Sequence, residues 1–149
     1  NNWLCGGSSN TGGNLLKKIF NDQEIKELSR QINPNQSSGF HLRPMPSAGE
    51  RFPINDPSLK PIMEPRPISD ALYLHAIFEG LARIESQGWA KLRELGAQTP
   101  QRLITIGGGA KNPQWRRIRE RIIGLPIKTC TKSTAEGSAL IALTTLSQN

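Results

Sequence analysis

The sequence predicts an α/β fold, because short apolar and β-branched runs alternate with longer segments of helical periodicity. Two of these runs, residues 3–5 and 102–106, lead into glycine-rich turns that a predicted helix follows. One segment, residues 69–95, has the spacing of a long helix. Together these features indicate an α/β domain, and no internal repeat is evident.

The first unit is a strand end at residues 3–5 followed by a turn at residues 6–13. Glycines stand there beside small hydroxyl and amide side chains, a mixture that lines phosphate pockets and also forms ordinary turns. A helix is expected from Asn14, with the apolar residues Leu15, Leu16, Ile19 and Phe20. Asp22 is expected to cap a second helix, which Asn33-Pro34 ends and which carries Ile25, Leu28 and Ile32 at helical spacing.

Residues 35–67 are rich in proline, glycine and serine and show little periodicity. A short strand is expected at residues 40–42, and the rest is predicted to be irregular. Long loops within compact domains are usually functional or disordered. The mixture of charged side chains with scattered apolar residues favours a segment that docks on another surface; the apolar residues are Phe40, Leu42, Met45, Phe52 and Ile54.

Ser69 is expected to open the longest helix, which runs to about Leu95 and stops at Gly96. Glu79 and Arg83 lie one turn apart and can pair. Glycines at positions 80 and 88 cost helix propensity, so another helix is expected to pack closely there. The predicted buried stripe consists of Leu74, Ile77, Phe78, Leu81, Ile84, Leu92 and Leu95.

The second unit is the stretch from residue 102 to residue 113, in which a β-branched run ends in three glycines. Asn112 is a good helix N-cap, and Pro113 suits the first helical position. Glycines let a ligand approach the backbone, and the free amides of a helix start favour phosphate. This spacing therefore predicts a nucleotide site, the alternative being a tight turn without a ligand. The P-loop and dinucleotide-binding patterns are absent.

The last part of the chain continues the alternation of helix and strand. Gly124 is expected to end the helix that starts at Pro113. Residues 127–130 form a short predicted strand. Residues 135–146 form a closing helix of small and apolar residues, suited to tight packing on a sheet.

The 149 residues have the length of one domain. A content of 36% hydrophobic and 5% aromatic residues is lean for a self-contained fold, and the chain enters a predicted strand without an initiator Met. We therefore expect a piece of a longer protein, with residues 1–149 forming one domain that is incomplete at its N-terminus. No apolar run approaches 18 residues and no leader pattern is present, so neither a membrane span nor a signal peptide is expected.

The formal net charge of +7 raises the question of nucleic-acid binding. Much of the excess lies in Lys111, Arg116, Arg117, Arg119 and Arg121. A helical wheel places Trp115, Ile118 and Ile122 on one face and spreads the arginines over the rest. Because no aromatic residues interleave with the arginines, we expect a solvated basic face and no nucleic-acid partner.

Cysteine and histidine are too sparse for a metal centre built by this chain alone. Cys5 and Cys130 stand far apart, each beside an apolar run, and are expected to be buried thiols in a reducing compartment. His41 and His75 are equally isolated. No metal ligand is therefore assigned.

Five motifs occur in a fixed order along the whole chain. They are Gly6-Gly7-Ser8-Ser9-Asn10, Gly49-Glu50-Arg51-Phe52-Pro53 with Asn55-Asp56-Pro57, Ala76-Ile77-Phe78-Glu79-Gly80-Leu81-Ala82, Gly107-Gly108-Gly109-Ala110-Lys111-Asn112-Pro113-Gln114-Trp115 with Gly124-Leu125-Pro126-Ile127, and Ala135-Glu136-Gly137-Ser138-Ala139-Leu140. In this order they resemble the C-terminal domain of the FGGY family of carbohydrate kinases. Residues 3–13 are most similar to a cyanobacterial and plant branch described as ribulose or xylulose kinase-like.

The resemblance implies an actin-like ATPase or ribonuclease H-like fold, in which two α/β domains close over a cleft. This chain would be most of the C-terminal, nucleotide-side domain. Matching of motifs implies nucleotide contacts from Gly7, Ser8, Gly107, Gly108, Gly109, Ala110 and Asn112. The second glycine turn would lie against the adenosine and proximal phosphates, Asn112 near the purine or ribose, and Gly7 near the phosphates. The two turns are thus expected to meet and hold ATP. Arg51 and Asp56 are expected to hold the domain together.

The resemblance also implies transfer of the ATP γ-phosphoryl group, with Mg²⁺, to a hydroxyl of a ketopentose, either D-ribulose or D-xylulose. The family's catalytic aspartate and sugar-binding residues lie upstream of Asn1, so no catalytic residue is assigned here and the chain alone is expected to be inactive. The implied partners are ATP or ADP, the sugar through the missing N-terminal domain, and a second copy in a homodimer. The implied compartment is the cytoplasm, or the plastid in a plant. The alternative is a non-catalytic kinase-like module that binds nucleotide or a partner.

Overall fold

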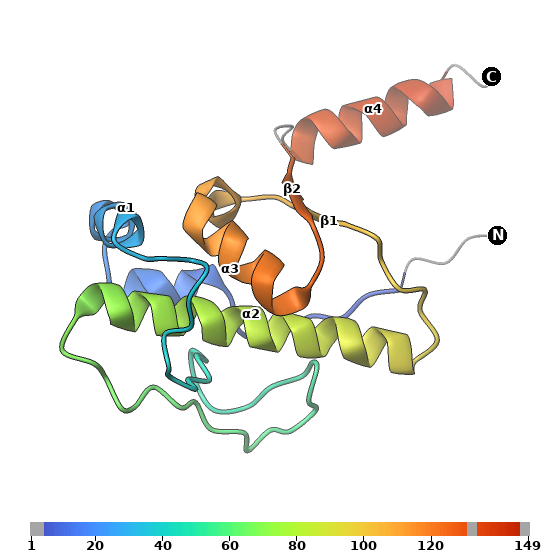
Figure 1. Cartoon of the computed structure of the whole chain (residues 1–149). Coiled ribbons are helices and arrows are strands. Elements are labelled where there is room, and N and C mark those ends of the chain that lie inside the picture. The colour runs from blue at the N-terminus through green and yellow to red at the C-terminus, as the bar shows by residue number, and fades with distance from the viewer. Residues whose placement is uncertain (1–4, 131–133, 147–149) are drawn as a thin grey trace.

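Helix α2 lies at the centre of the molecule, with α1 and α3 on one side and the segment 35–67 on the other (Figure 1). The computed structural model describes residues 5–130 and 134–146. With η for a 3₁₀ helix, the elements are η1 (Gly13–Lys18), α1 (Asp22–Arg30), α2 (Asp70–Glu94), β1 (Leu103–Thr105), η2 (Gly108–Lys111), α3 (Pro113–Ile123), β2 (Ile127–Thr129) and α4 (Thr134–Leu146).

The predicted boundaries of α2 are confirmed. The Ser69 side chain accepts a hydrogen bond from the Leu72 amide, and Gly96 turns the chain after the helix with a φ of 93°. Every residue from 73 to 82 is buried, because α2 is covered on several sides along this stretch. The predicted stripe is correct at Leu74, Ile77, Phe78 and Leu81. It is wrong at Leu95, which is 71% exposed because it lies past the covered part of the helix.

Close packing at the two helix glycines is confirmed, but its partner is a loop and not another helix. A β-carbon on Gly80 would lie 2.5 Å from Pro44 Cδ and 2.8 Å from the Leu42 carbonyl oxygen. A β-carbon on Gly88 would lie 3.1 Å from Phe52 Cε1. The glycines therefore let the segment 35–67 lie directly on the backbone of α2.

Replacing Gly80 with alanine should destabilise the protein although alanine is the better helix former. The helix gains about 1 kcal/mol, whereas overpacking costs about 1 to 3 kcal/mol. We expect a lower melting temperature by circular dichroism. Gly137→Ala is the matched control, because a β-carbon there meets nothing within 4 Å. A Gly80→Ala protein as stable as the wild type would contradict this packing.

The segment 35–67 docks on α2 of its own chain. Leu42 and Met45 are buried, which agrees with the docking role expected from its apolar residues. The strand predicted at residues 40–42 is wrong, because Leu42 lies against Gly80 instead of pairing with a neighbouring strand. The segment's ladder contacts are isolated antiparallel bridges, Arg43 with Ile62 and Glu50 with Asp56.

The helical region after the first turn differs in detail from the prediction. Residues 13–18 form a 3₁₀ helix that buries Leu15 and Leu16. The cap of α1 is Asn21 and not Asp22, since Asn21 and Glu24 form a reciprocal capping box. The helix ends at Arg30, before the predicted stop at Asn33-Pro34.

The α/β class is confirmed by the β1–α3–β2 unit, in which the two strands pair in parallel and α3 connects them. Leu103 pairs with Ile127, and Thr105 with Thr129. The strand predicted at residues 3–5 lies outside the described residues except for Cys5, which is not in a strand. Pro113 and Gly124 begin and end α3 as predicted, with Gly124 in the left-handed region.

Helix α4 forms as predicted but projects away from the body of the molecule (Figure 1). Tight packing on the sheet is therefore a wrong prediction for this structure, in which Leu143 is 62% exposed. Ile104 and Ile106, which flank the buried Thr105, also expose most of their surface. No helix within residues 5–130 and 134–146 combines the length and the apolar character needed to cross a bilayer.

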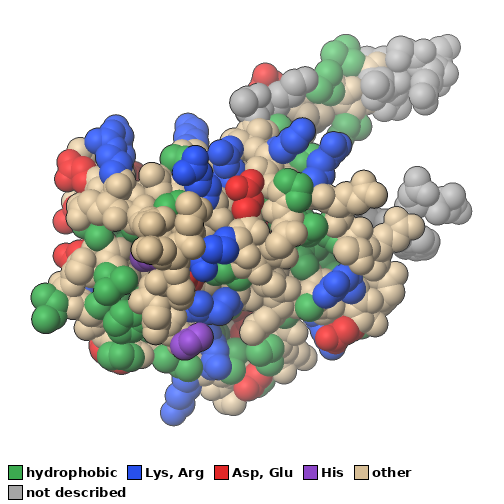
Figure 2. Space-filling model, viewed as in Figure 1, with side chains coloured by type: hydrophobic (Ala, Val, Ile, Leu, Met, Phe, Trp, Pro, Cys, Tyr) green, Lys and Arg blue, Asp and Glu red, His purple; other side chains and the backbone are tan. Residues whose placement is uncertain are grey.

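The basic residues of α3 are only partly solvated. Lysine and arginine side chains gather over the α1 and α3 side of the molecule (Figure 2). Arg119, however, binds the Glu85 carboxylate with two bonds of 2.7 Å, and Arg121 donates to Glu79 and to the Pro34 carbonyl. The prediction of a fully solvated basic face is therefore wrong for these two arginines, whose long side chains reach back to α2.

The expected burial of the thiols is also wrong. Cys5 is exposed, and Cys130 is partly exposed just after β2. The apolar core forms around α2 and includes neither cysteine.

The Glu79 carboxylate joins three parts of the fold, although its side chain is only 1% exposed. It accepts hydrogen bonds from the Ser38 amide and hydroxyl and from Arg121 of α3. The predicted Arg83 pair is present at 3.7 Å. Burial alone raises the pKa of the Glu79 carboxyl, but the hydrogen bonds from Ser38 and Arg121 outweigh it and hold the pKa below its usual value.

Glu79→Gln should destabilise the protein by roughly 2 to 4 kcal/mol at neutral pH, since it leaves Arg121 without its buried partner. A depressed folded pKa contributes stability above the ordinary value of 4.5, and this contribution disappears as the pH falls through the folded pKa. The gap between variant and wild type, measured by urea unfolding, should therefore narrow below pH 4.5. Glu94→Gln, which breaks an exposed pair, is the control. A gap that stays constant with pH would contradict the buried-charge account.

Candidate functional site

A cavity lies where the two glycine-rich turns meet. Its volume is about 820 Å³, which falls within the range of small-molecule sites. Residues 10–13 enter it from the first turn, and residues 108–110 from the second. Further walls come from Leu15, Leu16, Lys17, Lys18, Asp22, Ile25, Pro46, Phe78, Glu85, Thr105, Ile106, Asn112, Trp115 and Arg119.

The structure brings together most of the second predicted contact set and little of the first. Gly108, Gly109, Ala110 and Asn112 line the cavity, whereas Gly107 does not. Gly7 and Ser8 do not line the cavity either. The first turn lines the cavity with residues 10–13. The two turns therefore meet, with Asn10, Thr11, Gly12 and Gly13 in the place expected for Gly7 and Ser8.

The three consecutive glycines differ in backbone conformation and in the space around them. Gly107 has a φ of 88°, a conformation that favours glycine. A β-carbon on Gly108 would meet nothing within 4 Å, so its backbone is open for approach. A β-carbon on Gly109 would lie 2.2 Å from Trp115 Cζ3. Gly107 and Gly108 therefore both have open surroundings, as the sequence motif led us to expect, but only Gly108 of these two lines the cavity.

The Trp115 indole gives the cavity an apolar wall, and the buried Phe78 ring supports it. The rings of Phe78 and Trp115 stack with their centroids 5.2 Å apart and their planes 7° apart. Phe78 is fully buried on α2, and Trp115 lies in the first turns of α3. This wall is held by core packing and is therefore preformed.

Asn112 lies on the cavity with both polar atoms of its side chain in use. Its Oδ1 accepts from the Trp115 amide at 3.0 Å, which caps α3 as predicted. Its Nδ2 donates to Ser29 Oγ of α1 at 2.8 Å. The side chain thus joins α1 to the start of α3.

Both ends of the second turn are fixed by hydrogen bonds from neighbouring elements. Arg119 donates to Thr105 Oγ1 at 2.9 Å while it binds Glu85. Thr129 Oγ1 of β2 donates to the Ala110 carbonyl at 3.1 Å. The turn between β1 and α3 is therefore held from α3 on one side and from β2 on the other.

The first turn is held by Glu50, a residue that the sequence analysis did not select. Glu50 is 4% exposed and accepts from Ser9 Oγ at 2.6 Å and from the Asn10 amide at 2.7 Å. Burial alone raises the pKa of this carboxyl, but the hydrogen bonds from Asn10, Ser9 and Arg51 lower it overall. No periodicity reveals such a residue, because its partners lie about forty positions away.

The predicted structural roles of Arg51 and Asp56 agree with their contacts. Arg51 donates to Asn10 Oδ1 at 2.6 Å and to Ser8 Oγ at 3.3 Å. Asp56 accepts from the Ser58 amide and hydroxyl within its own turn. The Phe52 ring fills the space beside Gly7, since a β-carbon on Gly7 would lie 2.4 Å from Phe52 Cε1.

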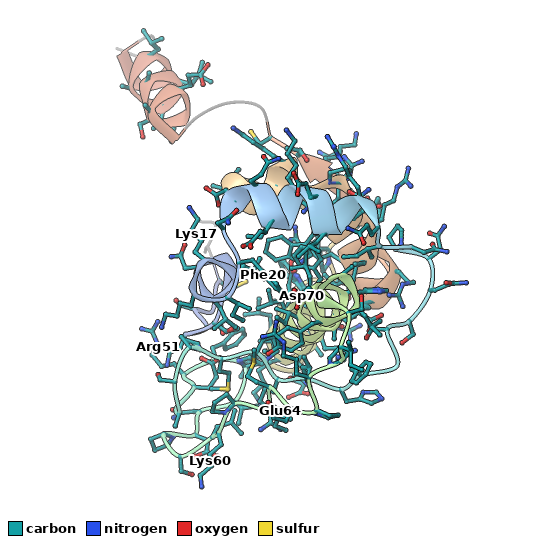
Figure 3. The ribbon with its side chains drawn as sticks, turned by 90° about the vertical axis from the view of Figure 1, so that its left-hand side faces the viewer. Lys17, Phe20, Arg51, Lys60, Glu64 and Asp70 are labelled. Atoms are coloured by element: carbon teal, nitrogen blue, oxygen red, sulfur yellow. The ribbon has the colours of Figure 1, made fainter. Side chains whose placement is uncertain are left out.

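Positive charge reaches the cavity from η1. Lys17 and Lys18 line it, and Lys17 pairs at 3.7 Å with Asp22, an exposed contact. Figure 3 shows Lys17 outside the core, whereas the nearby Phe20 lies toward α2. Arg119 adds little free charge, because Glu85 binds it. Among the described residues no group of three or more His, Cys, Asp or Glu side chains is placed to hold a metal ion.

The motifs that form this cavity also match a known family. The profile of the "FGGY family of carbohydrate kinases, C-terminal domain" matches residues 1–146, almost the whole chain. The chain belongs to this family. The FGGY C-terminal domain is part of the actin-like ATPase and ribonuclease H-like superfamily, and the β1–α3–β2 unit with its flanking helices agrees with that assignment.

One curated relative of this FGGY domain is an autoinducer-2 kinase from Enterobacter sp. (strain 638). It is 25% identical over 130 residues, which cover 86% of this chain and 23% of that protein. The FGGY domain described here therefore spans about a quarter of the length of that relative.

Glu50→Gln in this FGGY domain should loosen the first glycine turn without unfolding the core. A neutral amide cannot accept the same set of charge-assisted bonds, which we expect to cost about 1 to 3 kcal/mol. Hydrogen exchange should become faster in residues 8–13 and stay unchanged in α2. Glu64→Gln, an exposed carboxylate of the same segment, is the control (Figure 3). Unchanged exchange in the first turn would show that Glu50 does not hold it.

Proposed function

We propose that this FGGY domain is the nucleotide-binding part of an ATP-dependent carbohydrate kinase. The family consists of ATP-dependent sugar kinases, which gives the reaction class. The observation that carries the proposal is the meeting of both glycine-rich turns on one cavity of about 820 Å³. Such a volume suits a nucleotide, and backbone amides of glycine turns suit its phosphates.

Different walls of the cavity would serve different parts of ATP. The open backbone at Gly108 allows a phosphate or ribose to approach. Lys17 and Lys18 supply positive charge for the phosphates. The Trp115 indole, backed by the fully buried Phe78 ring, provides an apolar wall for the base. Gly7, Ser8 and Gly107 would act indirectly, by shaping the turns that carry the contacts.

We propose that this chain binds nucleotide but does not turn over sugar on its own. Phosphoryl transfer depends on holding nucleotide and acceptor in line, so both halves of a kinase must close around them. Of the cavity carboxylates, Glu85 is bound by Arg119 through two hydrogen bonds, and Asp22 lies in an exposed pair with Lys17 at 3.7 Å. The sugar-binding groups and the catalytic aspartate would come from the rest of the kinase.

The proposed acceptor is a ketopentose, D-ribulose or D-xylulose, because the first turn resembles the ribulose or xylulose kinase-like branch. A second candidate is the substrate of the relative named autoinducer-2 kinase. A panel of acceptors offered to the completed kinase would distinguish the two. A third outcome, nucleotide binding without turnover of any acceptor, would favour a non-catalytic kinase-like module.

The nucleotide proposal can be tested directly on this chain. ATP at 100 times its dissociation constant should stabilise it by about 2.7 kcal/mol and raise the melting temperature by roughly 5 to 10 °C. Gly108→Leu fills open space in the cavity and should abolish the shift while leaving the melting temperature without ATP unchanged. Co-expression with the remainder of the kinase should then give sugar-dependent ADP release. Absence of any ATP-dependent shift in the folded chain would refute the proposal.

A further inference from the structure

We propose that Trp115 is a positioning residue for nucleotide binding, whose indole ring sets the distance between the two glycine turns. The effect of Trp115 on ATP affinity rests on the proposed function. The arrangement of the ring between the turns is a property of the fold and can be tested without a ligand.

One edge of the indole contacts both turns. A β-carbon on Gly109 would lie 2.2 Å from Trp115 Cζ3 and 2.9 Å from Cε3. A β-carbon on Gly13 would lie 3.4 Å from Cη2 and 3.6 Å from Cζ3 of the same ring. Gly109 thus lies closer to the ring than a residue with a β-carbon could, and Gly13 lies near enough that a β-carbon there would be in ordinary van der Waals contact with the ring. The ring is the common boundary of two turns about a hundred residues apart in sequence.

The indole cannot move aside easily, because α2 and α1 fix it. Phe78, a fully buried residue of α2, stacks on its face at 5.2 Å. The Trp115 amide binds Asn112, whose side chain is joined in turn to Ser29 of α1. The indole Nε1 is buried and has no hydrogen-bond partner within the described part of the chain. Packing and not hydrogen bonding therefore holds the ring.

This arrangement gives Gly109 a different role from Gly108. A methyl group at position 108 meets open space, whereas a methyl group at position 109 must push the indole away. Displacing the indole moves the boundary that both turns share. A ligand bound across the two turns would lose its preorganised site. Its affinity would then fall, because binding would have to order the turns first.

The test is a double-mutant cycle between Gly109→Ala and Trp115→Ala, read by the ATP-dependent thermal shift. Each single substitution should weaken ATP binding about tenfold or more. Once the ring is gone, Gly109→Ala should have little further effect, about threefold or less, because the added methyl group has room. Trp115→Phe should restore most of the affinity, since a ring remains and no indole hydrogen bond is lost. Gly108→Ala controls for a methyl group in the turn and should change neither the apo melting temperature nor the Trp115 emission.

A fluorescence readout separates positioning from general stability. Trp3→Phe and Trp89→Phe together leave Trp115 as the sole tryptophan. Gly109→Ala should shift the emission of Trp115 in the absence of ligand, and ATP should change the wild-type emission with the same dissociation constant as the thermal shift. Should Trp115→Ala fail to fold, Trp115→Leu replaces it in the cycle.

Two results would overturn the inference. One is a folded Trp115→Ala protein that binds ATP as tightly as the wild type. The other is a cycle in which the effects of the two substitutions simply add. If the wild type binds no ATP, the proposed function fails, and hydrogen exchange decides the positioning role. Gly109→Ala should then speed exchange in residues 10–18 when Trp115 is present and not when it is absent; equal effects in both backgrounds would refute it.

Discussion

The buried carboxylate of Glu79 is the constraint on which the arrangement of the other elements depends. A charge removed from water is stable only where partners surround it, and here these come from Ser38 of the segment 35–67 and from Arg121 on α3. Satisfying this one group therefore fixes the loop and α3 on the same helix. Because Trp115 and Arg119 lie on α3, the position of α3 on α2 also decides where the walls of the cavity stand.

Aromatic rings of the same chain pack against both glycine-rich turns, in addition to the hydrogen bonds that hold them. Phe52 fills the space beside Gly7 and lies against Gly88 of α2, and Trp115 lies between Gly13 and Gly109. In both cases a missing β-carbon lets a ring approach the backbone. A glycine motif typical of ligand binding thus serves two purposes, since some of its glycines admit protein side chains and Gly108 remains open toward the cavity.

The FGGY family assignment and the geometry constrain different aspects of function. Membership of the family gives the reaction class, because it groups ATP-dependent sugar kinases. The cavity gives a physical basis for the nucleotide part of that reaction, with backbone amides, two lysines and an apolar wall in one place. The acceptor depends on residues that contact the sugar. This chain spans 23% of the length of the autoinducer-2 kinase that it matches.

The sequence by itself determined the elements whose signals are local. Capping residues and left-handed glycines placed α2 and α3 within a residue of their observed ends, and the turn at Gly107–Gly109 was found from its spacing. Only the tertiary structure decided which residues share a site. The roles of Glu50, Trp115 and Arg119 come from partners far along the chain, and their contacts follow from the packing on α2, which no local pattern encodes. The exposure of α4 and the absence of a strand at residues 40–42 have the same origin, since local propensity does not specify which surface a segment packs against.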